Sequence, residues 1–258
     1  MSVLPQRNIR LTLAYDGTDF FGWQVQKEGR TVQGVLEQAL TRMHGHPVHL
    51  QGAGRTDTGV HACGQVANFF TDLDSIPPER FRDAFNSYLP HDVRVLHSAA
   101  VPESFNAKSC AIMRVYAYNL YVAPVVLPQY RRYCWRMRRA PDVALLNRLA
   151  AQLVGTHNFA SFAAAGDATK SRVRRVAAAS FYPQGPFLVF RISASSFLWK
   201  MVRVMLGTMV ELEQEGSGPE RLAEILRLQD RKIAGSTAPA RGLFLERIIY
   251  DEENPGPF

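Results

Sequence analysis

The chain has 258 residues, of which 47% are hydrophobic and 21% charged, and its formal net charge is +7. These values are ordinary for a soluble protein with one large domain or two small ones, and no apolar run approaches the roughly 20 residues that a membrane-spanning helix needs. The N-terminus has an early Pro5 and Arg7 and no signal-peptide core, so we expect a cytoplasmic protein.

The first part of the chain alternates strand-like and helix-like patterns. Apolar side chains occur at every second position of residues 9–15, which predicts a strand, and Thr31 is a suitable N-cap for a helix with one apolar stripe. The expected elements are strands at 9–15, 64–70 and 93–101 and helices at 31–44 and 77–89. They suffice for an N-terminal α/β domain over residues 1–104.

The rest of the chain repeats this alternation. The expected elements are strands at 111–123, 172–182, 187–194 and 243–250 and helices at 141–154, 197–212 and 219–228. They predict a C-terminal α/β domain over residues 105–258. The expected fold class is therefore α/β of the α+β type, with two similar domains and a cleft between them.

The charge is distributed unevenly along the sequence. Residues 104–141 hold seven basic residues and no acidic one, and residues 168–210 again hold seven and none. The other 16 of the 30 basic residues are outnumbered by 23 acidic residues. A solvated surface usually mixes the two signs, so this separation favours a polyanionic partner, with nucleic acid as the leading candidate.

Neither cysteines nor histidines predict a metal site. Cys63, Cys110 and Cys134 are far apart and form no CxxC pair, which argues against a structural zinc site and a disulfide framework. The run HGHPVH at residues 44–49 has no acidic or sulfur companion, so a turn is favoured over a metal site. Glycine-rich nucleotide-binding motifs are also missing, and we expect no metal and no cofactor.

The stretch GAGRTDTGVHA, residues 52–62, places Arg55 and Asp57 among glycines and threonines ahead of a strand. A bend explains Asp57, because Asp is a common turn residue. A bend explains neither Arg55 nor the following His61. The stretch is therefore a candidate site rather than a simple turn.

A second Asp-Gly motif, YDGT at residues 15–18, resembles the loop of phosphatases that use an aspartyl nucleophile. In that loop the nucleophile precedes the second Asp by two residues, and this chain has Ala14 there. Alanine cannot attack phosphorus, so the phosphatase interpretation fails.

Arg203 lies in the apolar stretch FLWKMVRVMLGTMV, which only Lys200 and Arg203 interrupt. Spaced three residues apart on a helix, these two side chains would project from similar faces. Such an arginine either extends to water or meets a buried anion. Asp57 would be a fitting partner, because a nearby arginine keeps a carboxylate ionised and directed.

The segment QYRRYCWRMRR, residues 129–139, interleaves five arginines with three aromatic residues. As a strand, it would place Arg132, Arg136 and Arg138 on one face. That face would hold phosphates without reading bases. The further candidates for RNA contacts are Arg172, Arg174 and Lys200.

Eight blocks of the sequence, in order, resemble the tRNA pseudouridine synthase A family. They are YDGTDFFGWQVQ, TVQGVLEQAL, GRTDTGVHACGQVANF, LPHDVRV, SFNAKSCAIMRVYAY, LVGTHNFASF, MVRVMLG and ARGLFLERIIY. The third block is the most diagnostic, and together they cover nearly the whole chain. The resemblance implies two α/β domains with antiparallel sheets and a basic cleft, in a homodimer without a cofactor.

The resemblance also implies an activity and a set of site residues. The activity is isomerisation of uridine to pseudouridine in the anticodon stem-loop of tRNA, at positions 38, 39 and/or 40. The implied residues are the catalytic Asp57, the base-stacking Tyr116, the arginines Arg55 and Arg203, and the apolar Leu243 and Leu245 near the base. Lys200 stands where the family often has histidine, a departure that affects RNA contacts rather than the chemistry.

Two other classes of function compete with this one. A non-catalytic RNA-binding protein or chaperone would show the same basic segments, but it would not need Asp57, whose charge repels phosphate. A metal-dependent nuclease usually gathers several carboxylates around its ion, and the basic segments contain none.

Overall fold

The computed structural model describes residues 7–251, and the chain divides into two compact units. Unit 1 extends to Ile112 and takes up the chain again from Leu245, whereas unit 2 is Met113–Phe244. This division differs from the expected one after residue 104, because the last strand returns to pair in unit 1. Hydrophobic periodicity predicts that strand but does not reveal which sheet it joins.

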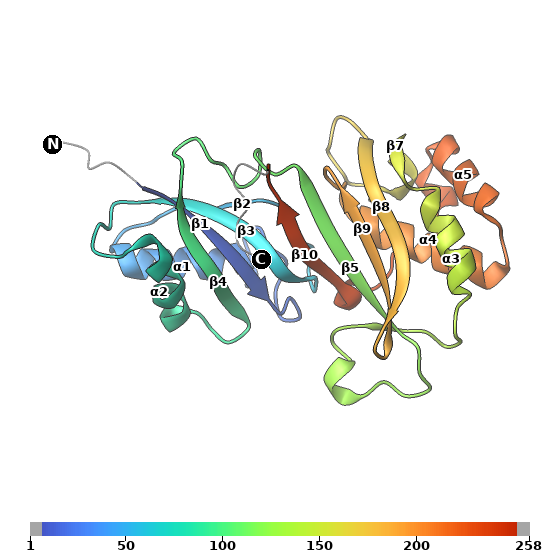
Figure 1. Cartoon of the computed structure of the whole chain (residues 1–258), viewed down its shortest axis with the longest axis horizontal. Coiled ribbons are helices and arrows are strands. Elements are labelled where there is room, and N and C mark those ends of the chain that lie inside the picture. The colour runs from blue at the N-terminus through green and yellow to red at the C-terminus, as the bar shows by residue number, and fades with distance from the viewer. Residues whose placement is uncertain (1–6, 252–258) are drawn as a thin grey trace. The chain divides into compact units, whose positions relative to one another are not determined.

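Unit 1 is a mostly antiparallel sheet with two helices (Figure 1). Its strands are β1 (Arg7–Tyr15), β2 (Gln51–Gly52), β3 (His61–Thr71), β4 (Val93–Val101) and β10 (Leu243–Ile249). Its helices are α1 (Val32–His44) and α2 (Phe81–Tyr88), the latter preceded by a 3-10 turn at Pro78–Arg80. The strand order is β4-β1-β3-β10, and the short β2 pairs antiparallel with β3, Gln51 opposite Asn68 and Gly52 opposite Ala67.

The core of unit 1 lies between its sheet and its helices. Ile9, Leu11 and Leu13 alternate along β1 and are fully buried, as the sequence pattern predicts. Phe69 of β3 pairs in register with Ile9 and therefore shares its face. The Phe69 ring meets the rings of the α2 residues Phe81 and Phe85 edge-on, with centroids 5.4 and 5.7 Å apart. The helices consequently cover this face of the sheet.

Helix α1 has the ends that its sequence predicts. The Thr31 side chain accepts a hydrogen bond from the Gly34 N–H at 3.3 Å, which satisfies one donor of the first turn. At the other end, Gly45 adopts φ 73° and its N–H bonds to the Thr41 carbonyl. The HGHPVH run therefore begins in the last turn of the helix and continues as a turn.

Unit 2 repeats the plan with more helices (Figure 1). Its strands are β5 (Met113–Tyr121), β6 (Trp135–Arg136), β7 (Gly155–Asn158), β8 (Val173–Gln184) and β9 (Phe187–Ala194). Its helices are α3 (Val143–Ala151), α4 (Met201–Glu215) and α5 (Pro219–Leu228). The antiparallel order is β5-β9-β8-β7, and the short β6 runs parallel to β5.

Helix α4 is the central buried element of unit 2. Eleven of its 15 residues are buried, which is the behaviour of a helix that is apolar on nearly all sides. Its one buried carboxylate, Glu213, is compensated: Arg139 binds both of its oxygens at 3.0 and 3.1 Å, and the Asp142 N–H donates at 3.0 Å. A buried charge without such partners would be strongly destabilising.

Two sequence-based expectations for unit 2 are wrong. Residues 129–139 do not form one strand, because a 3-10 turn at Pro128–Tyr130 is followed by only two strand residues, Trp135–Arg136. The apolar helix begins at Met201 rather than at residue 197, because Lys200 adopts a left-handed φ of 60°. Mostly antiparallel sheets and helices nonetheless confirm the α+β fold class. Within residues 7–251, no helix is both long and apolar enough to cross a membrane.

Gly207 of α4 faces the backbone of Ser236 so closely that a Cβ atom would collide with the Ser236 carbonyl. Gly207→Ala should force residues 235–238 off the helix and lower the free energy of unfolding by about 1–3 kcal/mol, measured by urea denaturation. The control is Gln214→Ala, an exposed position on the same helix, which should cost less than about 0.5 kcal/mol. Equal stabilities of the two variants would contradict this packing.

Candidate active site

The predicted catalytic residue lies in the loop of residues 53–60, which connects β2 to β3 and is called the Asp57 loop below. Arg55 is exposed, Thr56 is buried and Asp57 is half-buried. Of these three consecutive side chains only that of Thr56 is buried, so Thr56 holds the loop against the rest of the protein. Arg55 and Asp57 are carried by the same fixed backbone.

The segment of residues 15–23, which begins at the last residue of β1 and is called the supporting segment below, holds the Asp57 loop. The Trp23 N–H donates to the Thr56 carbonyl at 3.1 Å, and the Gly59 N–H donates to the Phe20 carbonyl at 3.3 Å. The Tyr15 hydroxyl lies 2.9 Å from the Thr56 hydroxyl oxygen. Both sides of Asp57 are therefore bonded to the supporting segment.

Two glycines permit this close contact. A Cβ atom on Gly17 would collide with the Val60 carbonyl, and one on Gly22 would lie 2.6 Å from the Thr56 carbonyl oxygen. Gly22 also has φ 84°, a conformation that other residues rarely adopt. The YDGT motif, set aside above as a phosphatase loop, thus serves to support a neighbouring loop.

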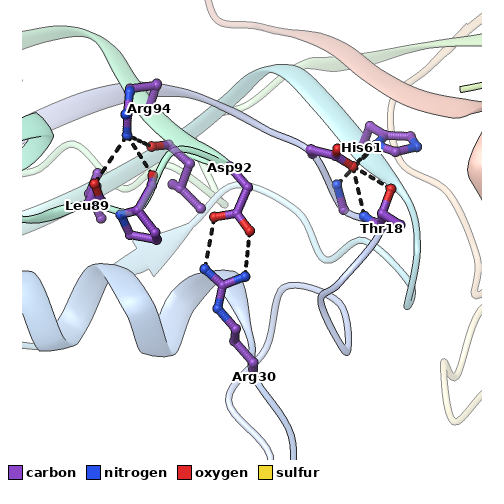
Figure 2. Close-up of polar contacts among 10 residues, drawn as sticks. Thr18, Arg30, His61, Leu89, Asp92 and Arg94 are labelled. Carbon is purple, nitrogen blue, oxygen red and sulfur yellow. Dashed lines mark hydrogen bonds and ion pairs between the residues drawn. The ribbon is translucent and has the colours of Figure 1, made fainter. Parts of the chain in front are cut away.

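His61 is part of this support (Figure 2). Its buried ring accepts a hydrogen bond at Nδ1 from the Gly17 N–H at 3.0 Å. The Asp16 Oδ1 atom lies 3.2 Å from the same nitrogen and accepts from the Thr18 N–H and hydroxyl at 3.0 and 2.6 Å. Nδ1 of His61 therefore lies between the Gly17 N–H and the Asp16 carboxylate. His61 links the supporting segment to the strand that follows the Asp57 loop.

The supporting segment is itself fastened by an ion pair (Figure 2). Arg30 binds both carboxylate oxygens of Asp92 at 2.5 and 2.8 Å, and this hydrogen bonding is the main cause of the raised pKa of Arg30. The guanidinium lies 4.1 Å from the centroid of the Phe20 ring. The backbone of Asp92 also accepts from the Asp16 N–H at 2.9 Å. These contacts join Asp16 and Phe20 of the supporting segment to Asp92 and Arg30 elsewhere in unit 1.

The predicted base-stacking residue, Tyr116, lies on β5 in unit 2 and pairs in register with Ile192. Its ring is 8% exposed and meets the ring of Phe197 edge-on, with centroids 5.2 Å apart. Phe197 lies in the irregular stretch between β9 and α4, because α4 begins only at Met201. The late start of the helix therefore leaves Phe197 beside Tyr116.

Arg203 lies in the first turn of α4 and is half-buried. Its Nε donates to the Ala238 carbonyl at 2.8 Å, and the Ala238 N–H donates back to the Arg203 carbonyl at 3.0 Å. The adjacent Pro239 carbonyl accepts from the Tyr118 hydroxyl at 2.7 Å. Burial raises the pKa of Tyr118, while the positive charge of Arg203 opposes that rise. Unit 2 thus brings Arg203 close to β5, the strand that carries Tyr116.

Both predicted apolar residues of the site are buried: the exposed fraction is 5% for Leu243 and 0% for Leu245. They lie at the start of β10, where the chain passes from unit 2 into unit 1. Each unit therefore holds part of the predicted set. Unit 1 contains Arg55, Asp57 and Leu245, and unit 2 contains Tyr116, Arg203 and Leu243.

The basic residues of 129–139 point outward despite the missing strand. Arg132, Arg136 and Arg138 are all exposed, while Cys134 and Met137 between them are buried. Arg136 donates through Nη2 to the Pro124 carbonyl. These three side chains are thus exposed, although they lie on an irregular segment.

Some of the other basic residues in residues 104–141 and 168–210 pair with acidic residues that lie just outside residues 168–210. Arg172 pairs with Asp167 at 3.5 Å, and Arg139 pairs with Glu213. Asp167 directly precedes one segment and Glu213 follows it by a few residues. Arg174 is partly buried, which lowers its pKa, and it donates to the carbonyls of Ser171 and Val173. The positive surface of unit 2 is consequently smaller than the sequence count indicates.

Lys200 and Arg203 do not share a helical face, contrary to the prediction. Lys200 precedes the helix with φ 60°, and its Nζ lies 4.7 Å from the centroid of the Trp199 ring. The three-residue spacing rule applies only inside a helix. Among the described residues, no three His, Cys, Asp or Glu side chains gather as a metal site.

Gly22→Ala should destabilise the protein more than Gly45→Ala. Both glycines have positive φ, 84° and 73°, so each substitution strains the backbone by about 1 kcal/mol. Only Gly22 faces a backbone oxygen, whereas nothing lies within 4 Å of a Cβ on Gly45. We expect urea denaturation to show an additional loss of at least about 1 kcal/mol for Gly22→Ala. Equal losses would mean that the two loops are not in tight contact.

Comparison with known proteins identifies the family. A family model described as tRNA pseudouridine synthase matches residues 12–108 and 149–251. Over 253 residues the chain is 44% identical to tRNA pseudouridine synthase A of Treponema denticola, covering 96% of this chain and 94% of that protein. The same enzyme of Moorella thermoacetica is 46% identical over 244 residues, which cover 94% and 99% of the two chains. That of Brachyspira hyodysenteriae is 39% identical over 247 residues, covering 95% and 99%. The family predicted from the sequence motifs is confirmed, and the chain belongs to the tRNA pseudouridine synthases.

Proposed function

We propose that this chain isomerises uridine to pseudouridine in the anticodon stem-loop of tRNA, at positions 38, 39 and/or 40, with Asp57 as the catalytic carboxylate. The observation that carries the proposal is the family match over nearly the whole chain, in which Asp57 lies on a loop anchored on both sides. We further propose that the protein acts as a homodimer in the cytoplasm, which the family resemblance supports.

The reaction rearranges one nucleotide without gaining or losing atoms. The bond between N1 of uracil and C1′ of the ribose breaks, the base turns, and C5 is joined to C1′. The proton of C5 leaves and N1 gains one, so neither an oxidant nor a phosphate donor is required. The protein must supply one ionised carboxylate and a surface that keeps the released base in place.

Asp57 can take part by three routes. Its carboxylate can add to C6 of the uracil, add to C1′ of the ribose, or remove a ribose proton. All three require the ionised form, because a protonated carboxyl group is neither nucleophile nor base. Arg203 and Arg55 are proposed to favour that form through their positive charge.

Tyr116 is proposed to hold the uracil. Its aromatic face suits a flipped base, and its hydroxyl can reach the C5 position during the proton loss. Leu243 and Leu245 are proposed as the apolar floor beneath the base. Turning a nucleotide out of its stack costs a few kcal/mol, less in a loop than in a duplex. Stacking on an aromatic ring offsets part of that cost.

The exposed arginines Arg132, Arg136 and Arg138 are proposed to contact the tRNA backbone. Arg172, Arg174 and Lys200 are proposed in the same role, although Arg172 already pairs with Asp167 and Lys200 lies over Trp199. Contacts of this kind supply affinity and orientation, and they carry little sequence information. The choice of uridine then depends on the shape of the stem-loop.

The rival classes are less well supported. The family match does not favour a non-catalytic RNA-binding protein, because the relatives carry an enzyme's name. A metal-dependent nuclease would stop in EDTA, whereas a synthase would continue to form pseudouridine. Mapping modified uridines in tRNA from cells with and without the gene identifies the target positions directly.

Asp57→Asn should abolish pseudouridine formation and leave tRNA binding within about twofold, because the amide keeps the shape of the side chain and removes its charge. Single-turnover conversion of tRNA under saturating enzyme measures the first quantity, and filter binding measures the second. Substantial conversion by Asp57→Asn would reject the assignment of the catalytic carboxylate.

Neutralising Arg136 and Arg138 to Gln should weaken tRNA binding and reduce its salt dependence. Each lost phosphate contact lowers the slope of log K against log salt by about one. The control is Arg80→Gln with Arg82→Gln, two exposed arginines of unit 1 that pair with Asp83 and carry the same total charge. A slope that changes equally in both double variants would assign the effect to net charge rather than to a binding surface.

A further inference from the structure

Thr56 directly precedes Asp57 in the Asp57 loop, and its side chain is buried. Thr56 is 7% exposed, and its hydroxyl oxygen lies 2.9 Å from the hydroxyl of Tyr15. Tyr15 is the last residue of β1 and is 4% exposed. A hydrogen bond between two buried hydroxyls therefore connects a sheet strand to the residue that precedes Asp57.

This hydrogen bond has a fixed chemical form. Burial is the main cause of a strongly raised pKa of Tyr15, so the phenol stays protonated at neutral pH. The buried Gln65 is a second hydrogen-bond partner of the same hydroxyl. Gln65 also donates through Nε2 to the Gly54 carbonyl at 2.8 Å. Tyr15 and Gln65 thus hold the loop by a side chain at residue 56 and by a carbonyl at residue 54.

The remaining contacts fix the backbone of the loop but leave the Thr56 side chain to Tyr15. The Thr56 carbonyl accepts from the Trp23 N–H at 3.1 Å, and the Asp57 carbonyl accepts from the Val60 N–H at 3.1 Å. A backbone rotation at residue 56 would swing the neighbouring Asp57, and it would have to break both the Trp23 and the Tyr15 hydrogen bonds. The Tyr15 hydroxyl opposes that rotation because its strand cannot follow.

We propose that Tyr15 is a positioning residue for Asp57: its hydroxyl fixes the Thr56 side chain and thereby sets the direction of the adjacent carboxylate. This inference rests on the proposed function, in which Asp57 acts on the uridine. Tyr15 touches neither base nor ribose in this role. Its effect is on the rate of the chemical step, because a misplacement of a reacting group by about 1 Å can cost 10²-fold.

The test is Tyr15→Phe, which removes the hydroxyl and keeps the aromatic ring, whose centroid lies 6.1 Å from that of the Trp23 ring. The single-turnover rate of pseudouridine formation at saturating enzyme should fall by roughly 10- to 100-fold, while the dissociation constant for tRNA stays within about twofold. A rate within twofold of wild type would overturn the proposal. Activity of the wild-type protein in the same assay tests the proposed function separately, and an inactive wild type would overturn both.

Tyr250→Phe is the matched control for stability. Tyr250 is also buried in unit 1, and its hydroxyl donates to the Ala107 carbonyl at 2.7 Å, away from the Asp57 loop. Both variants lose one buried hydroxyl and should lower the thermal midpoint by similar amounts. Only Tyr15→Phe should slow the reaction. A similar rate loss in both variants would assign the effect to general destabilisation and overturn the proposal.

Variants of Thr56 test the partner of the hydrogen bond. Thr56→Ser keeps the hydroxyl and should retain most of the rate, whereas the isosteric Thr56→Val should lose as much as Tyr15→Phe. Because the two hydroxyls form one interaction, the double variant Tyr15→Phe with Thr56→Val should be no slower than the slower single variant. Coupling through this bond would be contradicted if the rate loss of the double variant equalled the product of the two single-variant losses. It would also be contradicted if Thr56→Ser were as slow as Thr56→Val.

Discussion

Close contact between the supporting segment and the Asp57 loop is the constraint on which the rest of unit 1's candidate site depends. Gly17 and Gly22 make this contact possible, since a Cβ on either would collide with or crowd a carbonyl of the other loop. Once the backbones touch, hydrogen bonds from Trp23 and Tyr15 can reach Thr56. A loop rich in Gly and Thr would otherwise be mobile. Its rigidity comes from a neighbour about 40 residues earlier in the chain.

The same contact separates structural carboxylates from the proposed catalytic one. Asp16 accepts hydrogen bonds from Thr18 and lies against His61, and Asp92 is bound by both nitrogens of the Arg30 guanidinium. Both groups stabilise the supporting segment through these contacts. Asp57 lies at the edge of this network, half-buried on the loop that the network holds. An enzyme that needs one carboxylate in a defined direction benefits from placing the others in fixed structural roles.

Much of this architecture could be predicted from the sequence, and the failures have physical causes. Alternation identified the strand at 93–101, and the Thr31 cap identified the start of α1, because both signals are local. The left-handed Lys200 that delays α4, and the turn that breaks residues 129–139, depend on contacts distant in sequence. Counting charges within residues 104–141 and 168–210 missed Asp167 and Glu213, because both lie just outside the second range. The role of the YDGT stretch was missed because its partners Thr56, His61 and Asp92 are distant in the sequence.

The chemistry of an isomerisation explains why such a rigid loop is useful. Cleavage and re-formation of the bond at C1′ occur within one bound nucleotide, so the base must turn while the carboxylate stays where it is. A mobile Asp57 side chain could move together with the turning base. The advantage of holding the reacting groups in a fixed geometry would then be lost. Hydrogen bonds to the carbonyls of Gly54, Thr56 and Asp57 restrain the loop at three points. In the proposed reaction, the Asp57 loop would therefore be the fixed reference against which the uracil moves.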